Sequence, residues 1–136
     1  MPQDLIFAPM GALAFMTLGV LLLIPFRRVQ AGRAGLITPA DFRFGESARV
    51  PGEVSIPNRN YMNLLEAPTL FFPVCLMFFV THRLDATALA LAWSYVVLRA
   101  VHSAIHLTYN HVIHRLSVFA ASNLVLGVLW TLFFLN

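Results

Sequence analysis

Two groups of polar residues in this sequence have the types and spacing needed to hold an anionic molecule. The first lies in the segment 99–115, which carries two arginines and four of the five histidines. Arg99, His102 and His106 are spaced i, i+3 and i+7, so a helix presents them on one face. Arg115 follows nine residues later. Apolar segments flank this stretch, and ionisable side chains at membrane depth are costly and usually functional.

The second group is Arg59, Asn63 and Glu66, spaced i, i+4 and i+7, which again fall on one helical face. A helix rises about 1.5 Å per residue, so Glu66 lies about 10 Å along the helix from Arg59. By the same rise, Arg99 lies about 15 Å from the end of its helix near Tyr109. The two polar faces therefore reach similar depths, and we expect them to face each other or a hydrated cavity.

Two interpretations of these faces remain open. A buried ion pair between Glu66 and Arg99 would lock the helices together without binding anything. However, one carboxylate does not balance several arginines, and the surplus positive charge favours an anionic ligand. Guanidinium groups bind carboxylates in two-point fashion, while Glu66 could hold an ammonium group. A small zwitterionic molecule with carboxylates fits this combination.

A metal site is a further alternative. His102 and His106 are spaced i, i+4, and His111 and His114 are spaced i, i+3, which is compatible with zinc or iron. The neighbouring arginines oppose a bound cation, and no second acidic residue lies nearby. We therefore expect no metal.

The elements that position these residues are membrane-spanning helices. Of the 136 residues, 59% are hydrophobic and only 11% are charged, which is more apolar than a water-soluble domain. About 20 apolar residues cross a bilayer. This criterion predicts an all-α integral membrane protein, an up-down four-helix bundle, with Pro68 and Pro73 bending the second helix. The predicted spans are residues 5–26, 60–82, 86–109 and 116–135.

The polar connection 27–59 is rich in arginine, glycine and proline, and we expect little regular structure there. Its net charge is positive, and Arg115 lies at the same side of the bundle. The positive-inside rule therefore predicts a cytoplasmic connection with both termini outside the cytoplasm. The overall charge of +3 is too weak and too scattered to favour nucleic acid as a partner. The partner that we expect is membrane lipid.

The pattern Arg59-x-x-x-Asn63-x-x-Glu66 resembles a signature of the MAPEG superfamily, the membrane-associated proteins in eicosanoid and glutathione metabolism. The pattern Arg99-x-x-His102-x-x-x-His106, followed by Arg115, resembles a second one. The resemblance implies a homotrimer in which glutathione binds between subunits as a co-substrate. It also implies that Arg115 stabilises the glutathione thiolate. The residues that resemble glutathione-binding residues are Arg59, Asn63, Glu66, Arg99, His102 and His106.

Some positions depart from the eicosanoid enzymes of the family. Tyrosines are common in them at the positions of His106 and Phe119, Leu116 replaces a serine, and Met62 stands where some members have arginine. The resemblance therefore implies a glutathione transferase or peroxidase acting on lipophilic electrophiles or lipid hydroperoxides, in a bacterial inner membrane. One alternative is a non-catalytic protein of the same fold that binds lipid or a partner. A structural bundle, or a site for another small anion, is a third reading.

Overall fold

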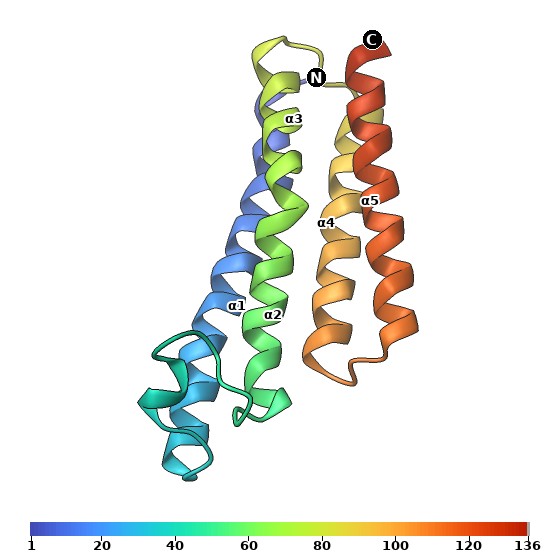
Figure 1. The fold of residues 1–136 in the computed structure, drawn as a ribbon. Coiled ribbons are helices and arrows are strands. Elements are labelled where there is room, and N and C mark those ends of the chain that lie inside the picture. Colours follow the sequence, from blue (N-terminus) through green and yellow to red (C-terminus); the bar gives the residue numbers. More distant parts are fainter. Residues whose placement is uncertain (136) are drawn as a thin grey trace.

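The computed structural model describes residues 1–135, which form four long helical rods and no β-strand. The first rod is a short 3-10 helix η1 (Gln3–Ile6) continued by α1 (Phe7–Arg33), and the second joins α2 (Gly52–Glu66) to α3 (Pro68–Val80). The others are α4 (Ala86–Leu107) and α5 (Val112–Leu135). Each rod is long and apolar enough to cross a membrane. The predicted all-α four-helix membrane bundle is confirmed, with both termini at the same end (Figure 1).

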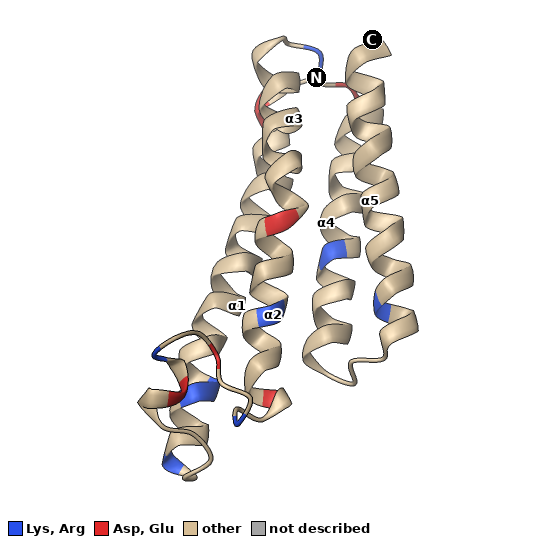
Figure 2. Cartoon of the chain, viewed as in Figure 1, with Lys and Arg blue, Asp and Glu red and all other residues tan. Residues whose placement is uncertain are grey.

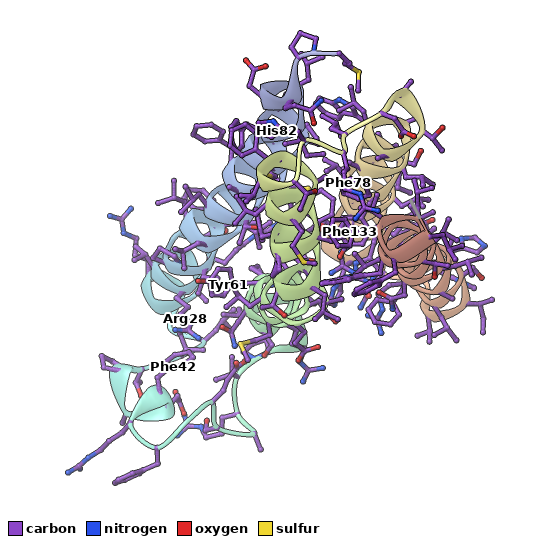
Figure 3. The ribbon with its side chains drawn as sticks, turned by 90° about the horizontal axis from the view of Figure 1, so that it is seen from above. Arg28, Phe42, Tyr61, Phe78, His82 and Phe133 are labelled. Atoms are coloured by element: carbon purple, nitrogen blue, oxygen red, sulfur yellow. The ribbon has the colours of Figure 1, made fainter. Side chains whose placement is uncertain are left out.

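Apolar side chains divide between the centre of the bundle and its outer surface. Inside, the ring of Phe71 stacks on Tyr95 with centroids 4.7 Å apart. Phe78 of α3 and Phe133 of α5 point toward each other, with centroids 5.2 Å apart (Figure 3). Outside, large side chains such as Phe15 are exposed. This two-sided apolar character is the pattern of helices that face lipid on one side and protein on the other.

Two prolines, Pro68 and Pro73, lie in the second rod, and a side chain from a neighbouring helix donates to a backbone carbonyl near each of them. Pro68 has no N–H and ends α2 at Glu66. Arg99 of α4 donates from Nη2 to the carbonyl of Asn63 at 2.7 Å, next to the carbonyl that Pro68 leaves unbonded. Near Pro73, the indole nitrogen of Trp130 on α5 donates to the carbonyl of Leu70 at 3.1 Å. The part of the second rod that holds Pro68 and Pro73 is thus hydrogen-bonded to side chains of α4 and α5.

The helix ends differ from the predicted spans, most clearly around the long connection. Helix α1 continues past residue 26 to Arg33, and α2 begins at Gly52, so the connection is residues 34–51 instead of 27–59. The apolar-run criterion measures the lipid-facing length only. The polar helix ends are stabilised outside it by a small apolar cluster made of Ala31, Ile37, Phe42, Val50 and Val54.

The other helix ends shift by two to four residues. The second rod ends at Val80 instead of residue 82, and α4 ends at Leu107 instead of residue 109. Helix α5 begins at Val112, four residues before the predicted start at residue 116. Its first turn carries His114 and Arg115, which do not belong to an apolar run but are compatible with a helix.

Asp41 organises the connection 34–51, where we expected little regular structure. It lies in the 3-10 helix η2 (Pro39–Phe42) and accepts hydrogen bonds from the Thr38 amide and the Ser47 hydroxyl, both at 2.8 Å. The next residue, Phe42, receives the guanidinium of Arg28 over its ring at 4.3 Å (Figure 3). The connection is therefore folded against the end of α1.

The hydrogen bonds to Asp41 predict an acid-sensitive connection. The Thr38 amide and then the Ser47 hydroxyl lower the pKa of this carboxyl in the folded state. The stabilisation is therefore complete above the usual carboxyl pKa of about 3.9 and is lost as the pH falls through the lower folded value. We expect Asp41→Asn to increase tryptic cleavage within residues 34–51 at neutral pH. Asp4→Asn, at an exposed carboxylate, is the control and should leave cleavage unchanged, and equal cleavage of both variants would contradict this role of Asp41.

Candidate functional site

A cavity of about 500 Å³ lies among α2, α4 and α5. It occupies the half of the bundle that is nearer to the long connection, where most of the arginines gather (Figure 2). Two arginines and one carboxylate line it, which gives it a net positive charge. Its lining residues are Asn58, Arg59, Met62, Asn63, Glu66, His102, His106, Val112, Arg115, Leu116 and Phe119.

Helix α2 contributes Arg59, Asn63 and Glu66 from one face, as their spacing predicts. Arg59 and Glu66 are exposed to the cavity, and Asn63 is half-buried. The side-chain amide of Asn63 donates to the carbonyl of Arg59 at 3.0 Å. This bond fixes the amide while its oxygen remains available to a ligand. The α2 face thus offers a cation, an amide and an anion in succession.

Helix α4 contributes His102 and His106, each only 2% exposed. Their ring centroids are 5.8 Å apart, and the ring of His102 also lies 5.8 Å from that of Phe119. Within residues 1–135, the Nδ1 atoms of both histidines have no hydrogen-bond partner. The imidazoles are therefore held by packing, and their polar atoms are not consumed by bonds within the chain.

Arg115 enters the cavity from the first turn of α5 and is held in place by Asn110. Its Nη1 donates to the side-chain oxygen of Asn110 at 2.6 Å. Asn110 has a φ of +48°, a left-handed conformation that asparagine adopts more readily than most residues. Its backbone N–H also donates to the carbonyl of Ile105 at 2.8 Å, which closes the end of α4. Sequence reasoning missed Asn110, although an asparagine in a short helix-to-helix connection is a signal for such a turn.

Arg99 is the one predicted site residue that does not line the cavity. It is fully buried, and its guanidinium carbon lies 5.6 Å from the ring centroid of Phe119, whose side chain does line the cavity. Its Nη2 is bonded to the Asn63 carbonyl, whereas Nε and Nη1 have no partner within residues 1–135. Arg99 therefore contacts the turn of α2 that carries Asn63.

The structure does not form the Glu66–Arg99 ion pair that we considered as an alternative. Among the described residues, no arginine nitrogen lies within 4.0 Å of a carboxylate oxygen. The guanidinium of Arg99 is taken by a backbone carbonyl, and Glu66 is exposed to the cavity instead. In residues 1–135 the carboxylate is thus available to a positively charged group of a ligand.

Comparison with known protein families gives a match that covers almost the entire chain. The model of the MAPEG family matches residues 6–135, which include helices α1 to α5 and every residue that lines the cavity. A search of curated proteins found no match, and a search of solved structures found none either.

Proposed function

The chain belongs to the MAPEG family, and from this membership we propose a glutathione-dependent membrane enzyme. Its substrates would be lipophilic electrophiles or lipid hydroperoxides that reach the protein from the bilayer. The chain is a multi-pass membrane protein of the family of membrane-associated proteins in eicosanoid and glutathione metabolism.

The observation that carries the proposal is the convergence of six predicted site residues on one cavity. Glutathione has two carboxylates, one ammonium group and one thiol. Arg59 matches a carboxylate through its two-pronged guanidinium. The side-chain oxygen of Asn63 can accept a hydrogen bond from an N–H of the tripeptide. Glu66 matches the ammonium group. His102 and His106 complete the wall of the cavity, and Arg115 lies at its α5 side.

Arg115 is the residue that we assign to the chemistry. The thiolate, not the thiol, is the nucleophile, and a nearby guanidinium favours the thiolate. The thiolate sulfur then forms a bond to the electrophilic atom while the leaving group departs. With a hydroperoxide, the sulfur attacks the terminal oxygen and the O–O bond breaks. An alcohol and a sulfenic acid form, and a second glutathione reduces the sulfenic acid to give the disulfide and water.

Arg99 has a different role in this proposal, as a positioning residue. It acts on the ligand through its neighbours, because its Nη2 holds the carbonyl of Asn63 and its guanidinium lies against the ring of Phe119. That bond fixes the turn of α2 from which Asn63 and Glu66 project into the cavity. The sequence-based expectation that Arg99 itself touches glutathione is replaced here by this indirect role.

A non-catalytic lipid- or partner-binding protein is the second candidate. The observation in its favour is the apolar character of the cavity wall next to Arg115, where Val112, Leu116 and Phe119 supply no hydroxyl group. Such a protein would use the same cavity for binding without turnover.

Family membership also supports a homotrimer with glutathione between subunits. The arginines near the long connection support a cytoplasmic position for that end, with both termini outside the cytoplasm. A bacterial inner membrane is the location that we propose.

A thermal-shift titration of the detergent-purified protein tests ligand binding directly. We expect a saturable rise in melting temperature with glutathione, because a ligand that binds only the folded state stabilises it by mass action. Glutamate, which lacks the thiol and the peptide extension, is the matched control. An absent shift at millimolar glutathione would contradict the proposal. A shift without conjugation or peroxidase activity would support the non-catalytic candidate.

A further inference from the structure

A second polar site lies where the ends of α1, α2 and α4 meet, apart from the cavity described above. Two small pockets, of about 230 and 150 Å³, adjoin each other there and share Arg27 and Glu53 as lining residues. Leu107 and Thr108, at the end of α4, line the larger pocket, and Gln30 of α1 lines the smaller one. Neither pocket shares a lining residue with the 500 Å³ cavity.

The two charged residues of this site have opposite signs but do not form an ion pair. Within residues 1–135, no Arg27 nitrogen lies within 4.0 Å of a Glu53 oxygen, and both side chains are exposed. A second negative group lines the same pocket as Glu53. It is the C-terminus of α4, which ends at Leu107 and whose last carbonyls carry a partial negative charge. The site therefore has a cationic side at Arg27 and an anionic side at Glu53 and the end of α4.

The site lies at the depth of lipid headgroups. Arg27 is the first charged residue after the apolar run that ends at Phe26, and α4 changes from membrane span to connection at Leu107. Ile56 and Pro57, which follow Glu53 along α2 toward the membrane span, also line the larger pocket. On the other side, the connection 34–51 packs its apolar cluster on α1 and α2. The charges are therefore placed between the hydrocarbon region and the folded connection.

From this arrangement we propose that the site binds the headgroup of phosphatidylethanolamine. Its phosphate accepts hydrogen bonds from the guanidinium of Arg27 and from the amide of Gln30. Its primary ammonium group donates to the Glu53 carboxylate and to free carbonyls at the end of α4. The acyl chains remain in the bilayer beside the bundle. No electron or proton transfer is involved, and the site is independent of the function proposed for the larger cavity.

The chemistry of the anionic side determines which headgroup is preferred. The ammonium of phosphatidylethanolamine has three N–H donors, whereas the quaternary ammonium of phosphatidylcholine has none to offer a carboxylate or a carbonyl. Phosphatidylglycerol carries the phosphate but no cation, so it satisfies Arg27 only. We therefore expect the order phosphatidylethanolamine first, with phosphatidylcholine and phosphatidylglycerol below it.

Native mass spectrometry of the whole protein in micelles with equal amounts of these three lipids tests the proposal. We expect bound phosphatidylethanolamine to exceed phosphatidylcholine by about threefold or more, the effect of about one net hydrogen bond, since both headgroups carry the same charge. Glu53→Gln should remove this preference and retain phosphatidylglycerol, because Arg27 remains. Arg27→Gln should lower the binding of all three lipids, and Arg27→Lys should retain part of it. Arg33→Gln is the matched control, since Arg33 is on the same helix and lines neither pocket.

Three results would overturn the proposal. Equal binding of the ethanolamine and choline lipids would mean that Glu53 and the end of α4 form no hydrogen bond with the lipid ammonium group. An equal effect of Arg33→Gln and Arg27→Gln would indicate general attraction of lipid to positive charge. Unchanged lipid binding in both pocket variants would indicate that neither Arg27 nor Glu53 contacts a lipid headgroup. The glutathione-dependent melting shift should persist in Glu53→Gln, so the two proposals fail or succeed separately.

Discussion

Replacement of Arg115 by alanine is expected to reduce the rate of glutathione conjugation by about 100-fold or more, with the fold intact. The guanidinium is the cationic group on the α5 side of the cavity, and without it the thiol of bound glutathione loses the charge that favours the thiolate. Arg115 is half-buried and bonded to the side chain of Asn110 only, so its loss leaves no buried backbone group unsatisfied. Initial rates with a chlorodinitrobenzene electrophile measure the effect, and a melting curve verifies the fold.

Asn110 provides a graded comparison for this prediction. Its side-chain oxygen holds Arg115 at 2.6 Å, so Asn110→Ala keeps the charge but frees the guanidinium. We expect a loss of about tenfold, mostly in kcat, because misplacement of a catalytic group lowers the rate more than binding. Ser117→Ala is the control, because Ser117 is an exposed residue of α5, two residues after Arg115, and does not line the cavity. Full activity of Arg115→Ala would show that the chemistry does not need Arg115, whereas binding of glutathione without any conjugation by the unsubstituted protein would favour the non-catalytic candidate.

The sequence was sufficient to predict the four rods and the two polar faces. Both depend on simple periodicity and length. An apolar run of about 20 residues has few alternatives to a membrane span, and a helix places Arg59, Asn63 and Glu66 on one face wherever it packs. Because the polar faces are excluded from lipid, their meeting among α2, α4 and α5 follows as well.

The helical spacing of residues could not predict which group each side chain contacts. Arg99 shares a helical face with His102, yet its partner is the backbone carbonyl of Asn63 on α2, and that contact is a property of two packed helices. The helix ends at Arg33 and Gly52 depend similarly on an apolar cluster that closes only in the folded connection. Asn110 matters through its positive φ, and sequence spacing does not specify a backbone angle.

Replacement of Glu66 by glutamine should leave the ligand-free protein as stable as before while abolishing most of its response to glutathione. Glu66 is exposed to the cavity and has no arginine within 4.0 Å among the described residues, so removal of its charge breaks no ion pair. An exposed substitution of this kind changes the free energy of unfolding by about 0.5 kcal/mol or less. In contrast, the loss of a charged hydrogen bond to the ligand ammonium costs about 1.5–3 kcal/mol, or roughly 10- to 100-fold in affinity.

Melting temperatures measured without ligand and during a glutathione titration distinguish a structural role of the Glu66 carboxylate from a ligand-binding role. The melting temperature without ligand reports a structural role, and the glutathione concentration at half-maximal shift reports a binding role. Glu53→Gln is the matched control, because it removes an exposed carboxylate from the same helix outside the 500 Å³ cavity. A large drop in the ligand-free melting temperature of Glu66→Gln would mean that this carboxylate serves the fold. The positive charge of Arg59 and Arg115 would then require a ligand whose ammonium group binds elsewhere, or one that has no ammonium group at all.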